Sequence, residues 1–276
     1  MNKKNLIKKT TASVAMSLAL LTTSHAVTIA SDDFSSGATS GGSGWDNNWQ
    51  IGSNGGSAGS VDLGALTTPL DGNGNYANIV GSGGNPTQGI HRNYTSALSS
   101  GTNQEHTISF LFRLDTLPAA TGDPSRGLVT HGATSFGLGG DSTWAFYVQE
   151  GTFRYFDGDG SGSFGGAATD SGVTAAVGDL YSVSINNRIG ADTTGPTTGG
   201  EWDLLVTNLS TSTTALDLSD LEFRTNTAPT AAFIGLGVAG SNVTSFDQLS
   251  VDVIPEPSSA ILLSLGGFGL LARRRK

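Results

Sequence analysis

The sequence predicts an all-β protein built as an antiparallel sandwich of two sheets. Short runs rich in aromatic and β-branched residues recur about every ten to twenty residues, and Gly, Ser, Thr, Asn and Asp separate them. No helical periodicity of useful length occurs between Val27 and Val253. A long antiparallel set must close or stack to protect its edges, and two stacked sheets in jelly-roll order do this. An immunoglobulin-like array is the alternative.

The individual strands follow from these runs. The strongest spans residues 106–114 and places Ile108, Phe110, Phe112 and Leu114 on one face. A hairpin is expected across Glu150 and Gly151, and residues 180–186 should pair with residues 202–208. In chain order, the predicted strands are 28–34, 45–51, 76–80, 90–94, 106–114, 126–131, 135–138, 144–149, 152–156, 180–186, 202–208, 233–238 and 246–253.

The first 26 residues have the organisation of a secretory signal peptide. An apolar stretch of ten residues, 12–21, follows a positively charged start, and Ser24 and Ala26 put small residues at a cleavage site. We therefore expect Val27 to begin the mature protein. The positive charges are Lys3, Lys4, Lys8 and Lys9.

Residues 254–276 form a tail with three parts. Pro255 and Pro257 make a stiff polar hinge, residues 260–272 are uncharged and largely apolar, and four cations, Arg273–Lys276, follow. As a helix, the apolar part would measure about 20 Å. A bilayer core is about 30 Å thick, so the sequence predicts a single short transmembrane helix that spans poorly. A buried C-terminal helix is the alternative, although such a helix seldom ends in four cations.

This tail resembles the PEP-CTERM sorting tail of Gram-negative bacteria. The matching residues are the motif Pro255, Glu256 and Pro257 and the basic end Arg273, Arg274 and Arg275. The resemblance implies recognition by an exosortase, a membrane-embedded protease-like enzyme, and export linked to exopolysaccharide. It further implies transient tethering to the inner membrane before release to the cell surface or extracellular matrix.

The body between signal and tail, residues 27–253, is strongly acidic. It holds 22 acids and six arginines without lysine, a net charge of −16. This charge argues against binding nucleic acid or anionic lipid. The chain has no Cys, which excludes both a disulfide scaffold and a thiol catalyst.

The body resembles the concanavalin A-like, laminin G-like sandwiches of exported proteins. The residues that carry the resemblance are 31–34 at the start of the body and 245–251 at its end, with 108–114 and 181–185 between them. The resemblance implies that the first and last strands are neighbours in one sheet.

Three sets of oxygen ligands could hold Ca²⁺. Asp157, Asp159 and Ser161 have the spacing of a calcium turn, and Asp71 begins a weaker one. Asp33 and Asp247, with Asp32, would meet if the terminal strands pair, and sandwiches of the resembled group sometimes hold structural Ca²⁺ there. Turn formation for the first two sets, and solvated surface acids for the third, are the alternatives.

The sequence offers no catalytic constellation. Glu201 and Asp203 alternate as the acids of a sandwich glycosidase do, but the third acid is missing. Each His stands alone, and no nucleophile elbow occurs. We therefore expect a non-enzymatic protein, with a glycan-active hydrolase as the alternative.

Sugar binding is better supported than catalysis. Trp45, Asp46, Asn48 and Trp49 combine aromatic and polar groups within five residues, and on a strand the two Trp would share a face. Core packing of these Trp is the alternative. Together, these features predict an exported surface protein with a structural or adhesive role in extracellular polysaccharide.

Overall fold

The computed structural model describes most of the body. The described residues are 26–54, 59–72, 74–82, 87–94, 104–116, 126–132, 142–158, 168–189, 200–223 and 233–253. Most of the predicted signal, all of the predicted tail, and strand 135–138 lie outside these ranges. Within them, no helix is long and apolar enough to cross a membrane. Both sheets belong to one compact unit, Thr28–Val253.

Fifteen strands make up the described structure. They are β1 (Val27–Asp32), β2 (Gln50–Asn54), β3 (Ser60–Ala65), β4 (Tyr76–Val80), β5 (Thr87–Asn93), β6 (Gln104–Thr116), β7 (Arg126–Gly132), β8 (Ser142–Gln149), β9 (Thr152–Tyr155), β10 (Thr169–Thr174), β11 (Leu180–Ile189), β12 (Gly200–Asn208), β13 (Thr213–Glu222), β14 (Phe233–Ala239) and β15 (Val243–Val253).

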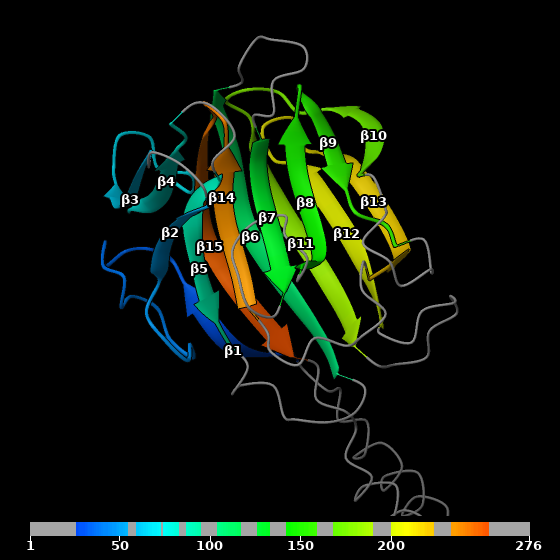
Figure 1. Ribbon diagram of the computed structural model, residues 1–276, viewed down its shortest axis with the longest axis horizontal. Coiled ribbons are helices and arrows are strands. Elements are labelled where there is room, and N and C mark those ends of the chain that lie inside the picture. Colours follow the sequence, from blue (N-terminus) through cyan, green and yellow to red (C-terminus); the bar gives the residue numbers. More distant parts are fainter. Residues whose placement is uncertain are drawn as a thin grey trace, which may run out of the picture. The chain divides into compact units, whose positions relative to one another are not determined.

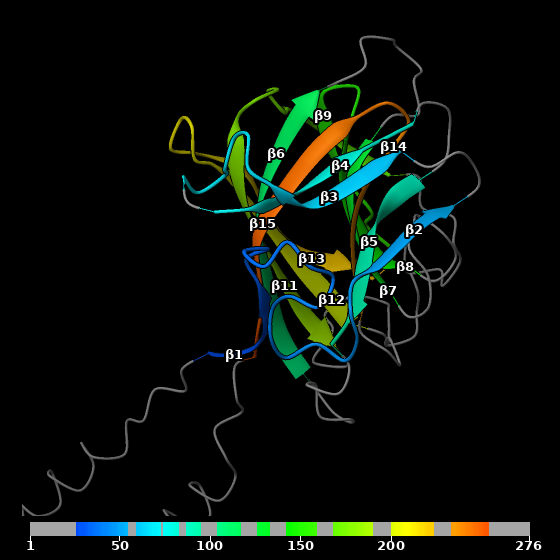
Figure 2. The ribbon, with the colours of Figure 1, turned by 90° about the vertical axis from the view of Figure 1, so that its left-hand side faces the viewer.

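The strands form two stacked sheets, as predicted (Figures 1 and 2). The eight-stranded sheet has the order β13-β12-β11-β6-β15-β4-β3, with β1 also paired to β15. The seven-stranded sheet has the order β10-β9-β8-β7-β14-β5-β2. The last two strands enter opposite sheets, β14 between β5 and β7 and β15 between β4 and β6. An immunoglobulin domain has seven to nine strands, so the immunoglobulin-like alternative does not hold.

The pairing of first and last strands, expected from the resemblance, is confirmed by β1 and β15. A side-chain hydrogen bond also links these two strands: the Thr28 hydroxyl donates to an Asp252 carboxylate oxygen at 2.5 Å. The predicted pairing of β11 with β12 holds along both strands. The hairpin between β8 and β9 turns at Glu150 and Gly151, which have φ of 52° and 80°. Two successive positive φ values are the mark of a tight I′ hairpin turn.

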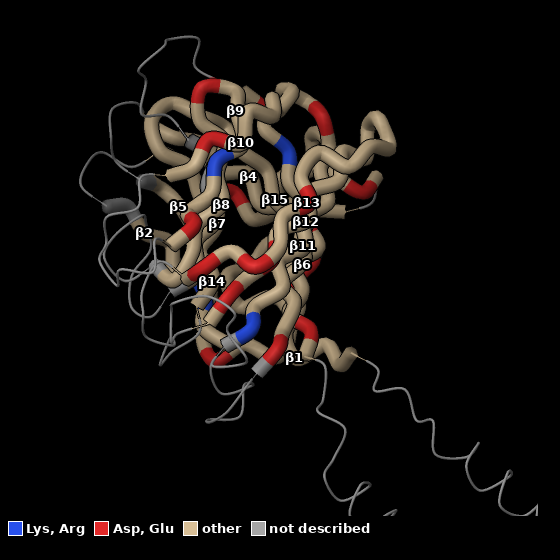
Figure 3. The backbone as a smooth tube through the Cα atoms, turned by 90° about the vertical axis from the view of Figure 1, so that its right-hand side faces the viewer, with Lys and Arg blue, Asp and Glu red and all other residues tan. Residues whose placement is uncertain are grey.

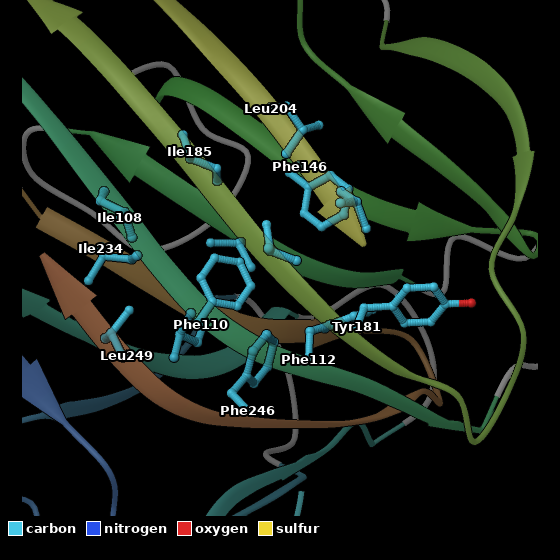
Figure 4. Close-up of a cluster of buried hydrophobic side chains, with 14 of the residues drawn as sticks. Ile108, Phe110, Phe112, Phe146, Tyr181, Ile185, Leu204, Ile234, Phe246 and Leu249 are labelled. Atoms are coloured by element: carbon cyan, nitrogen blue, oxygen red, sulfur yellow. The ribbon is translucent and has the colours of Figure 1, made fainter. Parts of the chain in front are cut away.

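The core lies between the sheets and follows strand alternation. Ile108, Phe110, Phe112 and Leu114 of β6 are all buried on the predicted face, and the inward residues of β11 and β12 pack beside them. Figure 4 shows this cluster, in which Phe112 meets Phe146 from the opposite sheet. Truncating a buried aromatic of this kind costs about 3–5 kcal/mol.

One irregularity in β15 shapes the surface near β1. Between Asp247 and Ser250, β15 advances by one residue more than β6, which is a β-bulge. Gln248 takes up the extra residue with φ of 49°. The bulge switches which positions face the core, because Phe246 points inward before it and Leu249 and Val251 point inward after it.

Some predicted elements differ from the structure. The strand predicted at 45–51 is wrong for most of its length, since β2 begins at Gln50 and residues 45–49 form a loop that bends at residues 46 and 47. Strands β3, β10 and β13 were not predicted. Two of these, β10 and β13, are edge strands rich in Ser, Thr and Asp, and most of their residues are exposed or half-buried. They lack the apolar alternation that identifies a strand from sequence.

Candidate functional site

An open polar cleft of about 550 Å³ lies where β1 meets the bulge of β15. Hydroxyl, carboxylate and amide groups dominate its lining, which comes from three segments distant in sequence. These are the end of β1 with the turn after it, the loop around residue 42, and the bulge. The lining residues are Ser31, Asp32, Asp33, Ser35, Gly42, Ser43, Gln248, Leu249 and Ser250.

The cleft brings together the acids of the predicted terminal-strand site. Asp247 lies at the bulge and is 2% exposed, and its carboxylate accepts a hydrogen bond from the Gln248 N–H at 2.8 Å. Burial, followed by the charges of Asp71, Asp33 and Asp32, raises the pKa of Asp247 from 3.8 to about 7. This carboxyl group therefore changes charge near neutral pH.

Asp33 contrasts with Asp247 although both belong to the same cleft. Asp33 is exposed, and its carboxylate accepts a hydrogen bond from the Ser35 N–H at 3.0 Å. Hydrogen bonding to Ser35 lowers the pKa of Asp33. Across the cleft, the Gln248 amide donates to Asp71 at 2.9 Å, so the bulge also holds the turn of the weaker predicted calcium site.

The third acid, Asp32, is buried and bonded to other protein groups. Its carboxylate, 3% exposed, forms a buried salt bridge with Arg92 of β5 at 3.1 Å. It also accepts hydrogen bonds from the Trp49 indole at 2.7 Å and from the Phe34 N–H at 2.8 Å. A buried carboxylate with this many partners is satisfied, so Asp32 has a structural task.

The predicted aromatic sugar platform needs correction. Trp45 and Trp49 do not share a strand face, because both lie in the loop before β2. Trp49 is 2% exposed, and the Arg92 guanidinium lies over both rings, at 5.2 Å from the centre of Trp45 and 5.5 Å from that of Trp49. A sugar cannot stack on a ring that the protein already covers, so the core alternative holds for Trp49.

Trp45 is half-buried, and its indole donates to the Ser31 carbonyl at 3.0 Å. Asp46 and Asn48, which flank the two Trp, are exposed. The polar part of the predicted glycan set is thus at the surface, but it lacks the flat aromatic face that the prediction assumed.

The described residues do not complete a metal centre from side chains alone. No group of three His, Asp or Glu among them is arranged to hold one metal ion. Of the two predicted ligands, Asp33 lines the cleft and could contribute an oxygen, whereas Asp247 is buried beneath it. The remaining ligands would have to be hydroxyl, amide or backbone oxygens. At the other predicted site, Asp157 accepts a hydrogen bond from the Glu222 N–H at 3.0 Å, while Asp159 and Ser161 lie outside the described residues.

Glu201 and Asp203 do lie on one face of β12, as predicted, but Arg188 of β11 holds both. Arg188 pairs with Glu201 at 3.3 Å, with Asp220 at 2.8 Å and, most closely, with Asp203. Burial lowers the pKa of Arg188, but bonding to these carboxylates outweighs it and raises the pKa overall. Neither acid is thus an independent proton donor or nucleophile.

Every arginine whose side chain the structure describes is paired with at least one carboxylate. Besides Arg92 and Arg188, Arg113 pairs with Asp115 at 2.5 Å, and Arg154 pairs with Asp170 at 3.1 Å. Figure 3 shows the resulting imbalance, with acids spread over the described backbone and few cations among them. The acidic charge of the body therefore remains largely uncompensated.

Two residues that matter for the cleft escaped sequence reasoning. Arg92 fixes the loop through Asp32, Trp45 and Trp49, and Gln248 creates the bulge. The predicted strand 90–94 held a usable signal for Arg92, because alternation places it on one face with Ile90 and Tyr94, and a cation on an apolar face needs a partner. Nothing local marks Gln248, since left-handed backbone is usual for Gly and Asn rather than Gln.

Comparison with known families identifies the end of the chain. Residues 253–276 match the PEP-CTERM protein-sorting motif. This is a PEP-CTERM sorting tail. It indicates export and sorting to the cell surface in bacteria, and the PEP-CTERM motif implies processing by an exosortase. None of the curated proteins compared with the chain matches it.

Among solved structures, the PEP-CTERM chain is similar to several lectin-like sandwiches. An endo-β-1,4-glucuronan lyase from the fungus Trichoderma reesei is 14% identical with a TM-score of 0.46, over 82% of this chain and 95% of the lyase. A PL-14 alginate lyase from Aplysia kurodai is 11% identical with a TM-score of 0.45, over 64% and 82%. Lectin II from Ulex europaeus is 12% identical with a TM-score of 0.46, over 74% and 93%. These likenesses concern the fold alone.

Proposed function

We propose that this exported protein is a structural or adhesive component of extracellular polysaccharide, and that it binds glycan in the cleft between β1 and the β15 bulge. The observation that carries the proposal is the lining of this cleft. Hydroxyls of Ser31, Ser43 and Ser250 stand beside the Asp33 carboxylate and the Gln248 amide. These groups can donate hydrogen bonds to the hydroxyls of a sugar ring and accept hydrogen bonds from them.

The charged side chains in the cleft indicate which class of glycan it would bind. None of the residues that line the cleft is Lys or Arg, so the described lining offers no cation to meet a uronate carboxylate. A neutral or amino-sugar polysaccharide therefore suits the cleft. An acidic polysaccharide would need a bridging divalent cation, for which Asp33 is the exposed carboxylate in the lining.

The proposed role is binding without catalysis. Glu201 and Asp203, the acids considered for a hydrolase, are both ion-paired to Arg188. A general acid must be free to reach the leaving group, and a carboxylate held by a guanidinium is not. Asp247 has a raised pKa, but it is buried beneath the cleft.

The test is retention of the full-length protein on immobilised polysaccharides: a neutral glucan, a polymer of glucosamine, and alginate. We expect retention on the first or second and none on alginate without added cation. The variants Asp33→Asn and Gln248→Ala should reduce retention at least several-fold, because each removes a hydrogen-bonding group from the cleft.

The matched control is Asp62→Asn. Asp62, like Asp33, is an exposed acid whose carboxylate accepts a hydrogen bond from the N–H two residues later, at 2.9 Å. It lies outside the cleft, so its replacement changes the net charge equally and should leave retention unchanged. Equal losses in Asp33→Asn and Asp62→Asn would mean that general charge, and not the cleft, governs binding.

A further inference from the structure

A cluster of three ionisable side chains is enclosed between the two sheets. His106 comes from β6 of the eight-stranded sheet, His131 from β7 of the seven-stranded sheet, and Tyr94 directly follows β5. All three side chains are fully buried. This cluster could not be predicted from spacing, since the two His are distant in the chain.

A single hydroxyl joins the two imidazoles. The Tyr94 hydroxyl lies 3.1 Å from Nε2 of His106 and 2.8 Å from Nε2 of His131. The hydroxyl has one proton, so it donates to one imidazole while it accepts from the N–H of the other. This arrangement requires at least one neutral imidazole, and it connects the two sheets through one bridging oxygen.

Two uncharged side chains, Trp144 and Asn187, lie beside the pair. Trp144 of β8 stacks on His131, with ring centres 5.3 Å apart and planes at 9°, and donates its indole N–H to the Asn187 amide oxygen at 2.5 Å. Nδ1 of each imidazole is buried without a hydrogen-bond partner. Within the described ranges, neither imidazole is paired with a carboxylate.

We propose that Tyr94, His106 and His131 form an acid-sensitive latch between the two sheets. The latch holds the sheets together while the imidazoles are neutral. It opens on acidification, because an imidazolium in this enclosed site would have neither water nor a carboxylate to balance its charge.

The direction of the pH effect follows from the two pKa values. Burial lowers the pKa of His106 to about 4, and burial together with the charge of His106 lowers that of His131 to about 3. In the unfolded chain both are near 6.5. Stability from the latch is therefore complete above pH 6.5 and is lost as the pH falls toward 4. At pH 5, each His should raise the unfolding equilibrium constant about 30-fold over pH 8, and the pair about 1,000-fold.

The first experiment is urea unfolding of the full-length protein at pH 8 and pH 5, with His106→Gln and His131→Gln. Glutamine keeps an amide for hydrogen bonding but does not titrate. In each variant, the ratio of the unfolding equilibrium constants at pH 5 and pH 8 should therefore be about 30-fold smaller than in wild type. His91→Gln is the control, because His91 is half-buried and lies outside the cluster. Replacing His91 should leave most of the pH dependence of unfolding unchanged. Equal pH dependence in wild type and both cluster variants would overturn the latch.

The second experiment needs no substitution and holds even if the variants fail to fold. NMR titration of the imidazole resonances in the folded wild-type protein should show both His neutral down to about pH 5. An imidazole in the cluster that titrates near its ordinary value while the protein remains folded would refute the proposal.

Discussion

Replacing Asp247 by Asn should remove the loss of stability that this buried carboxyl group causes as the pH rises. The Asp247 carboxyl is buried, and its pKa is raised from 3.8 to about 7. Between these two pH values the folded state binds more protons than the unfolded chain. The contribution of this group to stability is therefore greatest below pH 4, falls as the pH rises, and levels off above pH 7.

The size of the effect follows from the difference between the two pKa values. A shift of about three pKa units corresponds to roughly 4 kcal/mol, by which the ionised carboxylate destabilises the folded state above pH 7. Asparagine has nearly the same shape and stays neutral. The variant should thus be more stable than wild type by up to about 4 kcal/mol at pH 8.5, and by nearly nothing at pH 4. The new amide N–H group will reduce this gain if it finds no acceptor.

The assay is urea unfolding of both proteins from pH 4 to pH 8.5, with the difference in unfolding free energy plotted against pH. The control is Asp33→Asn in the same cleft. Hydrogen bonding lowers the pKa of Asp33, so its ionised form favours folding and its replacement should cost stability at neutral pH. Parallel pH profiles for wild type and Asp247→Asn would show that the Asp247 carboxyl is not held in an unfavourable environment.

Three further outcomes can be measured. Arg92→Ala should lower the unfolding free energy by about 3–5 kcal/mol, because it leaves Asp32 buried without its partner; a urea midpoint close to wild type would contradict this. If the cleft binds Ca²⁺, that ion should raise the melting temperature more than Mg²⁺ at equal ionic strength, and Asp33→Asn should abolish the difference; equal shifts would indicate charge screening alone. Mass spectrometry of the mature protein from its host should find no peptide from residues 261–276 after exosortase processing, and intact basic ends on most copies would argue for retention.

The parts of the fold that could be predicted are those with local signals. Strand β4 was predicted with its observed bounds, and the inward face of β6 was predicted residue by residue. In β6 apolar residues alternate with others, and β4 is a short run of mostly apolar residues flanked by turn formers. The tail was equally readable, because its motif, apolar stretch and basic end are contiguous in the chain.

The cleft was only half predictable, for a physical reason. That Asp33 and Asp247 approach each other follows from the pairing of the terminal strands. The raised pKa of Asp247 depends on burial and on the charges of acids from distant segments, and Trp49 is covered by Arg92 of β5. Spacing suggested a strand for Trp45 and Trp49, but contacts made only in the folded protein decided their environment.

The position of β15 has a consequence for how the protein is made. This strand contains the last residues of the body, yet it lies between β6 and β4 inside the eight-stranded sheet and also pairs with β1. The sheet cannot close until the final segment of the body has emerged, and such distant pairings form slowly. An exported chain must cross the membrane before it folds. Because the last strand of the body lies inside the sheet, the sheet stays incomplete until that strand has crossed the membrane. At that point only the sorting tail remains to follow.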